Sequence, residues 1–185
     1  MQKIGFLGMG VMGLPMAKNV VQKCGLPGLG YDVVQQQMDA FREAGGIPVS
    51  DPAEIYKACD VILQILPTHP IIRNSVEQAI QYGKPGNVIV DLSSTAPDII
   101  LELYQQAKDA GMFLLDSPVS GGETGANGGT LVIMCGGEKE VFDEVRPYLL
   151  MMGKTATYMG PSGCGSTAKV ANNMMVGIHL CAMGE

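Results

Sequence analysis

Short apolar runs alternate along the chain with longer segments in which apolar residues recur at helical spacing. The runs predict strands, and the longer segments predict helices that end near glycine. The predicted strands are 3–7, 29–31, 47–49, 61–66, 88–92, 113–116, 131–135 and 155–158. The predicted helices are 11–23, 34–43, 52–58, 71–82, 96–110, 138–150 and 162–185. We expect Asp51 to cap the helix that begins at Pro52, and Thr95 to cap the helix that contains Pro97.

The repeated strand–helix–strand order predicts an α/β fold with a mostly parallel sheet and helices on both faces. The apolar run 61–66 is typical of a parallel strand that is covered on both faces. The last segment differs because it is helical in pattern but apolar on nearly every side, so protein must cover it. We therefore expect one domain over 1–161. Residues 162–185 should start a long interdomain helix, which leads to an all-helical domain absent from this chain or is covered by a partner chain.

Composition narrows the class of protein. The chain has 185 residues, 46% of them hydrophobic, which is enough for one domain with a sizeable core. A net charge of −6 without a basic cluster argues against nucleic-acid binding, and no apolar run is long enough to span a membrane. The 5 cysteines lack C-x-x-C spacing and only 2 histidines accompany them, so we expect free thiols and no metal site. Without a signal-peptide pattern, we expect a cytoplasmic protein, or a mitochondrial-matrix protein if a transit peptide has been removed.

Three glycines follow the first predicted strand and open the first predicted helix. They are Gly8, Gly10 and Gly13, in the spacing G-x-G-x-x-G. In a dinucleotide-binding turn these glycines permit the tight bend, the approach of a diphosphate and the packing of helix on strand. Asp32 stands at the end of the second predicted strand, directly after residue 31 and roughly 20 residues after Gly13, where a carboxylate binds ribose hydroxyls and repels a 2′-phosphate. The combination predicts a Rossmann-type doubly wound domain that binds NAD rather than NADP. The alternative is a purely structural turn with a solvated strand end.

Four segments together resemble the β-hydroxyacid dehydrogenase family, and they are spread over nearly the whole chain. They are I-G-F-L-G-M-G-V-M-G-L-P-M-A-K-N at 4–19, D-L-S-S-T-A-P at 91–97, D-S-P-V-S-G-G at 116–122 and G-C-G-S-T-A-K-V-A-N-N at 163–173. Gly125 and G-G-T at 128–130 follow the third segment. Their joint occurrence in this order is specific to the family, and less specific to one substrate.

The resemblance implies a role for each matching residue. The residues assigned to the cofactor are Gly8, Met9, Gly10, Val11, Met12, Gly13, Asp32, Leu66, Pro67 and Thr95. Ser120, Gly121 and Gly122 are implied to hold the substrate carboxylate, Lys169 to be the catalytic acid or base, and Asn173 to orient the substrate. One departure is Ile71, where many relatives have an asparagine, so one cofactor hydrogen bond of the family is in question here.

The chemistry of hydride transfer agrees with these roles. Reducing a carbonyl leaves negative charge on oxygen, which a positioned acid must neutralise. Lys169 is the only lysine or arginine of the final predicted helix, and Asn173 shares its face four residues later. Partial burial would lower the pKa of this lysine toward the working range. The alternatives are that Lys169 extends to solvent and that Gly121 and Gly122 form a simple turn. We interpret Asn172 as a structural contact between helix and sheet rather than as a ligand of the substrate.

We therefore expect an oxidoreductase that transfers a hydride between NAD and a small β-hydroxy acid resembling 3-hydroxyisobutyrate. The alternative within this class is a reductase of tartronate semialdehyde or a dehydrogenase of another β-hydroxy acid. The alternative outside it is a non-catalytic dinucleotide-binding module. The resemblance also implies a small hydroxy acid as substrate and a homo-oligomer at full length. Without the all-helical domain, this chain alone would lack one wall of the substrate cleft.

Overall fold

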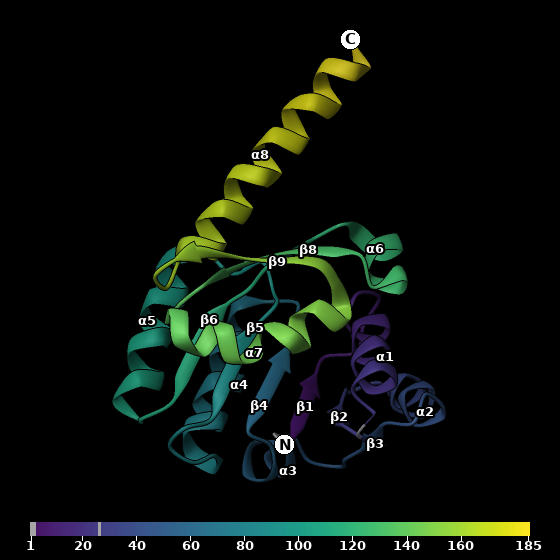
Figure 1. The fold of residues 1–185 in the computed structure, drawn as a ribbon, viewed down its shortest axis with the longest axis vertical. Helices are drawn as coiled ribbons and strands as arrows, with labels where there is room; N and C mark the ends of the chain where they lie inside the picture. Colours follow the sequence, from purple (N-terminus) through teal and green to yellow (C-terminus); the bar gives the residue numbers. More distant parts are fainter. Residues whose placement is uncertain (1–2, 26) are drawn as a thin grey trace.

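The computed structural model describes residues 3–25 and 27–185, which fold into a sheet flanked by helices (Figure 1). The strands are β1 (Ile4–Leu7), β2 (Leu29–Tyr31), β3 (Ile47–Pro48), β4 (Val61–Gln64), β5 (Val88–Asp91), β6 (Phe113–Asp116), β7 (Val119–Ser120), β8 (Leu131–Gly136) and β9 (Gly153–Gly160). The helices are α1 (Gly13–Cys24), α2 (Gln35–Glu43), α3 (Pro52–Ala58), α4 (His69–Tyr82), α5 (Pro97–Asp109), α6 (Gly122–Gly128), α7 (Lys139–Met152) and α8 (Cys164–Gly184).

The sheet has the order β3-β2-β1-β4-β5-β6-β8-β7, with β9 also paired to β8. The first six strands of this order are parallel, whereas β8 runs antiparallel to β6 and β7, and β9 runs parallel to β8. The chain winds outward from β1 to β3 and then returns to place β4 on the other side of β1. Ligands of doubly wound sheets bind at such a switch point, beyond the carboxyl ends of the strands. The predicted fold class is confirmed.

Two apolar layers hold the helices against the sheet. Met16 of α1 and Leu149 of α7 belong to the layer on one face, which α2 completes. Ile55 of α3 and Leu103 of α5 belong to the layer on the other face, which includes α4. Strands β1, β4 and β5 are buried along their whole length, as parallel strands covered on both faces are.

The two predicted helix caps have different outcomes. Asp51 caps α3, because its Oδ1 accepts a hydrogen bond of 2.8 Å from the N–H of Ala53. The prediction that Thr95 caps α5 is wrong, because Ala96 occupies the N-cap position and no side chain caps this helix. The Thr95 hydroxyl instead donates to Oδ2 of the buried Asp91 at 2.6 Å. A buried carboxylate requires hydrogen-bond donors, and the Thr95 hydroxyl points toward Asp91 because it supplies one of them.

The segment between β6 and β8 contains two elements that the hydrophobic pattern did not predict. Strand β7 has only 2 residues, and α6 is a 7-residue helix that includes three of the chain's glycines. Glycine is a poor helix former, and elements this short produce no measurable periodicity. Ser120 ends β7, Gly121 is the N-cap residue of α6 and Gly122 begins α6, and these are the three residues expected to hold the substrate carboxylate.

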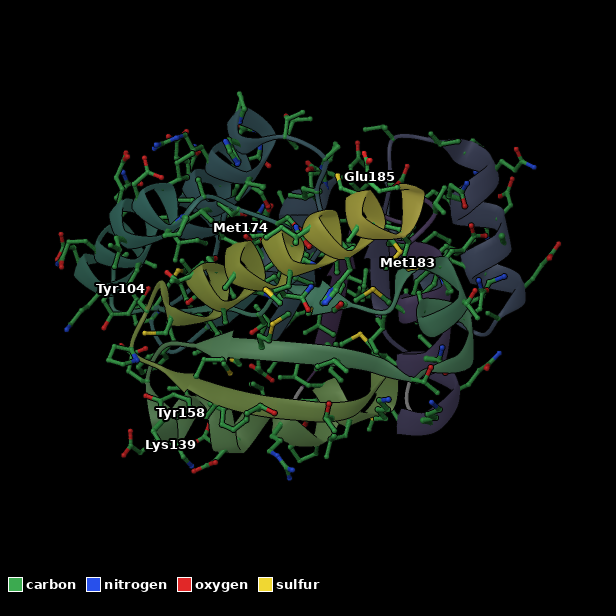
Figure 2. All side chains as sticks on the ribbon, turned by 90° about the horizontal axis from the view of Figure 1, so that it is seen from above. Tyr104, Lys139, Tyr158, Met174, Met183 and Glu185 are labelled. Atoms are coloured by element: carbon green, nitrogen blue, oxygen red, sulfur yellow. The ribbon has the colours of Figure 1, made fainter. Side chains whose placement is uncertain are left out.

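Helix α8 leaves the domain beyond the carboxyl ends of the parallel strands and projects away from it (Figure 1). Its first turn is packed, with Gly165 and Ser166 buried. Farther along, Met174 is 62% exposed and Met183 is 83% exposed, and both lie on the projecting part (Figure 2). The expected long, uniformly apolar helix is therefore present. In the part of the chain that the structure describes, no helix is long and apolar enough to cross a bilayer.

Candidate functional site

A cavity of about 670 Å³ lies at the switch point between β1 and β4. Its walls come from the glycine turn after β1, the end of β2, the segment after β4, and helices α3 and α4. Its lining residues are Leu7, Gly8, Gly10, Val11, Met12, Gly13, Tyr31, Asp32, Val33, Pro52, Tyr56, Ile65, Leu66, Pro67, Ile71, Asn74, Ser75 and Gln78. The lining is mainly apolar with a few polar groups, as in small-molecule sites. The structure thus brings most of the residues assigned to the cofactor to one cavity.

The three positions of the turn are occupied by glycine for different structural reasons. Gly8 has a φ of 85°, its N–H donates to the Tyr31 carbonyl at 3.1 Å, and a Cβ there would overlap the carbonyl oxygen of Ile65. A Cβ at Gly13 would overlap the carbonyl oxygen of Gly8. A Cβ at Gly10 would have no described atom within 4 Å, because this position faces open space. Gly8 and Gly13 are therefore required by the fold, whereas Gly10 keeps part of the cavity free.

The glycine turn also presents unpaired backbone donors. The N–H groups of Gly10, Val11 and Met12 have no acceptor within the described residues, and α1 begins directly after them. Such amides at a helix start, together with the helix dipole, favour an anion. An open position at Gly10 beside three free amides fits the diphosphate of a dinucleotide.

Asp32 lies directly after β2, lines the same cavity and binds the glycine turn through its carboxylate. Its Oδ2 accepts from the N–H of Met9 at 2.5 Å, and its Oδ1 accepts from the N–H of Val34 at 2.8 Å. Each carboxylate oxygen can accept a second hydrogen bond, so both remain able to bind a ribose hydroxyl. The Met9 side chain itself is 0% exposed and packs in the core. The Met9 side chain therefore does not face the cavity in this structure, whereas its N–H holds the Asp32 carboxylate, and a contact of Met9 with the cofactor stays a prediction.

A buried row of polar groups, not predicted from the sequence, begins at the cavity wall. The Tyr56 hydroxyl lies 2.8 Å from Ser75 Oγ, which donates to Gln64 Oε1 at 2.8 Å. Gln64 Nε2 in turn donates to Asp91 Oδ1 at 3.3 Å. Burial raises the pKa of Tyr56 to about 12, so its hydroxyl stays protonated and serves as a donor.

The row ends at Asp91, which holds two loops together. The Ser93 hydroxyl donates to Asp91 Oδ1 at 2.6 Å and accepts from the N–H of Leu66 at 2.9 Å. Burial raises the pKa of Asp91, although the donors that surround it oppose this shift. Thr95 is only 3% exposed and does not line the cavity, because its hydroxyl is bound to Asp91. In this structure the Thr95 hydroxyl supports the loop, and the contact of Thr95 with a cofactor stays a prediction.

Ser120, Gly121 and Gly122 lie where β7 ends and α6 begins. A Cβ at Gly122 would have no described atom within 4 Å, so this turn is open on one side. Helix α6 is held against α1 by Asn19, whose Nδ2 donates to the Ala126 carbonyl at 3.0 Å. The predicted carboxylate turn and the glycine turn thus belong to two directly connected helices.

Lys169 and Asn173 lie on α8. Burial lowers the pKa of Lys169 below its ordinary value, which increases its neutral fraction at a given pH. Asn172, one residue before Asn173, donates from Nδ2 to Ser120 Oγ at 3.4 Å. This confirms the interpretation of Asn172 as a contact between helix and sheet. Asn173 is exposed.

A family model described as the NAD binding domain of 6-phosphogluconate dehydrogenase matches residues 3–160. Among curated proteins, 2-(hydroxymethyl)glutarate dehydrogenase of Eubacterium barkeri is 34% identical over 99% of this chain and 62% of its own length. Mitochondrial 3-hydroxyisobutyrate dehydrogenase of Mus musculus is 36% identical over 98% of this chain and 55% of its own length.

A solved structure agrees with the sequence matches. Mycobacterium tuberculosis 3-hydroxyisobutyrate dehydrogenase with L-serine superposes with a TM-score of 0.94 at 32% identity, over 98% of this chain and 62% of that one. The chain therefore spans less than two thirds of the length of each of these three relatives, 55–62%.

Proposed function

Because this chain belongs to the family of NAD-binding domains found in β-hydroxyacid dehydrogenases, we propose that it serves an enzyme that transfers a hydride between NAD and a small β-hydroxy acid. The observation that carries the proposal is the cavity at the switch point. It combines an open Gly10, three free amides at the start of α1 and a partly exposed Asp32.

Different residues of the cavity would bind different parts of the cofactor. We propose that the amides after Gly8 bind the diphosphate, and that Asp32 binds the hydroxyls of the adenosine ribose. The side chains of Leu66 and Pro67 would contact the cofactor where it leaves the cavity toward the substrate. The carboxylate of Asp32 repels a 2′-phosphate, and the residue after it is Val33 rather than arginine, so NAD is favoured over NADP.

The names of the relatives suggest the substrate class. 3-Hydroxyisobutyrate, L-serine and 2-(hydroxymethyl)glutarate all carry a hydroxymethyl group on the carbon that bears a carboxylate. They differ only in the remaining substituent on that carbon. We propose that this chain binds the shared part, with the carboxylate at Ser120, Gly121 and Gly122. An open turn at the start of α6 with glycine amides suits a carboxylate.

Lys169 would supply the acid–base chemistry. When bound, NAD supplies the acceptor for the hydride that leaves the alcohol carbon. Neutral Lys169 would take the hydroxyl proton during oxidation, and protonated Lys169 would return it to the carbonyl oxygen during reduction. The burial that lowers its pKa makes the neutral form accessible. Asn173, four residues later on the same helix, would orient the substrate beside it.

The exposed apolar length of α8 belongs to the same proposal. Met174, Ile178 and Met183 leave a large apolar surface in solvent, which isolated soluble domains rarely do. We propose that an all-helical domain, in the same or a second subunit, covers this helix in the intact protein and closes the substrate cleft.

Two measurements test the proposal. Calorimetric titration of this chain with NADH and NADPH should show tighter binding of NADH. Steady-state assays of the intact protein with 3-hydroxyisobutyrate, L-serine and 2-(hydroxymethyl)glutarate should show NAD-dependent oxidation of at least one. Lys169→Ala should abolish that turnover while it leaves NADH binding unchanged. NADH binding without turnover of any β-hydroxy acid would indicate a non-catalytic dinucleotide-binding module.

A further inference from the structure

Asp116 is a buried carboxylate for which the proposed mechanism has no use. It is the last residue of β6, is 0% exposed and pairs with Gly136 of β8. No ion pair within the described residues includes it. Its Oδ1 accepts from the N–H of Gly163 at 2.9 Å, and its Oδ2 accepts from the N–H of Ser166 at 2.7 Å. Asp116 therefore caps the start of α8 from a distant strand.

The first turn of α8 fits this cap closely. A Cβ at Gly165 would overlap the carbonyl oxygens of Asp116 and Met134, and a Cβ at Gly136 would lie 2.5 Å from Asp116 Oδ1. The backbone of the helix thus lies directly against the backbones of β6 and β8. Burial raises the pKa of Asp116, and the two amides and the helix dipole oppose that shift by stabilising the carboxylate.

A second contact fixes the helix on the other side of Lys169. Asn172 donates to Ser120, which lies four residues after Asp116 in the same segment. Ser166, Lys169 and Asn172 are spaced by three residues, so they lie along one side of α8. Lys169 is therefore placed between two anchors that both belong to the short segment 116–120.

We propose that Asp116 is a positioning residue, which holds the start of α8 so that Lys169 faces the Ser120 turn. This inference rests on the proposed function for its consequence in catalysis, but its structural part can be measured without any turnover. Without the cap, the first turn of α8 would retain two buried amides with no acceptor, and the helix would tilt or fray. The lysine would then move away from the turn and into solvent.

The test compares Asp116→Ala and Asp116→Asn with Asn87→Ala in this chain. Asn87 is a matched control because it is also buried and binds two backbone groups, the Cys59 carbonyl at 2.7 Å and the Lys84 N–H at 2.7 Å. It precedes β5, at the opposite end of the strands. Amide exchange at residues 163–169 should accelerate at least about tenfold in Asp116→Ala, from the loss of charge-assisted hydrogen bonds, and stay unchanged in Asn87→Ala. Asp116→Asn keeps one acceptor and should lie between them.

A nuclear magnetic resonance titration of the Lys169 side chain gives the second measurement, with Lys169→Arg used to assign the signal. In Asp116→Ala its pKa should rise, because the lysine becomes solvated. Loss of a nearby negative charge alone would lower that pKa, so the sign separates repositioning from a simple charge effect. If Asp116→Ala fails to fold, Asp116→Asn is measured in the same way. Unchanged exchange and an unchanged or lowered pKa in the folded variant would overturn the proposal.

Kinetics of the intact protein supply the third measurement. Asp116→Asn should lower kcat at least about threefold while the affinity for NADH stays within about twofold, because the cofactor cavity is on other strands. A loss confined to NADH affinity would contradict the positioning role. If the wild-type protein itself oxidises no β-hydroxy acid, the proposed function fails, and the exchange and titration results still decide whether Asp116 holds α8.

Discussion

Replacing Gly10 with alanine separates a binding role of the glycine turn from a purely structural one. The φ of Gly10 lies outside the left-handed region, and a Cβ at this position meets no described atom within 4 Å. The folded chain can therefore accept the methyl group without strain. Alanine also restricts the unfolded chain, so the free energy of unfolding should be unchanged or higher by up to about 1 kcal/mol.

The same methyl group would occupy the space beside the free amides of Gly10, Val11 and Met12. A diphosphate displaced by about one methyl radius would lose at least one charge-assisted hydrogen bond, which contributes about 1.5–3 kcal/mol. The dissociation constant for NADH should therefore rise roughly 10- to 150-fold. Calorimetric titration of the wild-type chain and of Gly10→Ala with NADH measures this change directly.

Gly13→Ala is the matched control, since its Cβ would overlap the Gly8 carbonyl oxygen inside the folded chain. Such overpacking costs about 1–3 kcal/mol, which lowers Tm by roughly 2–12 °C in a chain of this size. Thermal melting should therefore show a clear loss for Gly13→Ala and none for Gly10→Ala. The argument would be refuted if Gly10→Ala bound NADH like the wild type, or if it melted as early as Gly13→Ala.

Four further predictions concern three other positions. Asp32→Asn should narrow the preference for NADH over NADPH, because the amide no longer repels a 2′-phosphate, and parallel titrations with an unchanged preference would contradict this. Lys169→Arg should abolish turnover of the intact protein, since a guanidinium stays protonated. In the wild type, the rate of oxidation should rise with pH and reach a plateau below pH 10.5, the ordinary pKa of lysine, because burial lowers the pKa of Lys169. A rate that does not change with pH would exclude Lys169 as the base. Asp91→Ala should lower Tm by roughly 5 °C or more by leaving the buried donors of Ser93 and Thr95 unpaired, which circular dichroism would show.

Local sequence features predicted most of the fold. The apolar runs correspond to strands, and the boundaries of β2 and β6 agree to the residue. Proline and glycine marked the helix ends, and Asp51 was recognised as a cap because its partners follow within three residues. These signals depend on neighbours in the chain, so no knowledge of the folded state was needed.

Groups whose partners lie far along the chain were not predicted. The contact of Gln64 with Asp91 and the contacts of Asp116 with α8 join residues separated by 27 to 50 positions. Hydrophobic periodicity identifies which face of an element is buried, but it does not indicate which polar group a buried carboxylate meets.

The structure places the proposed binding of cofactor and of substrate on different parts of the sheet. The cavity is built on β1, β2 and β4, whereas segment 116–122 ends β6, caps α8 and presents Ser120. Asn19 links the two regions through a direct hydrogen bond, because it joins α1 to α6, the helix that begins at Gly122. Because Lys169 and Ser120 are tied to the same segment, a displacement of α8 moves the proposed acid–base group and the carboxylate turn together. We therefore infer that substitutions in 116–122 change kcat, and that substitutions in the cavity change the affinity for NADH.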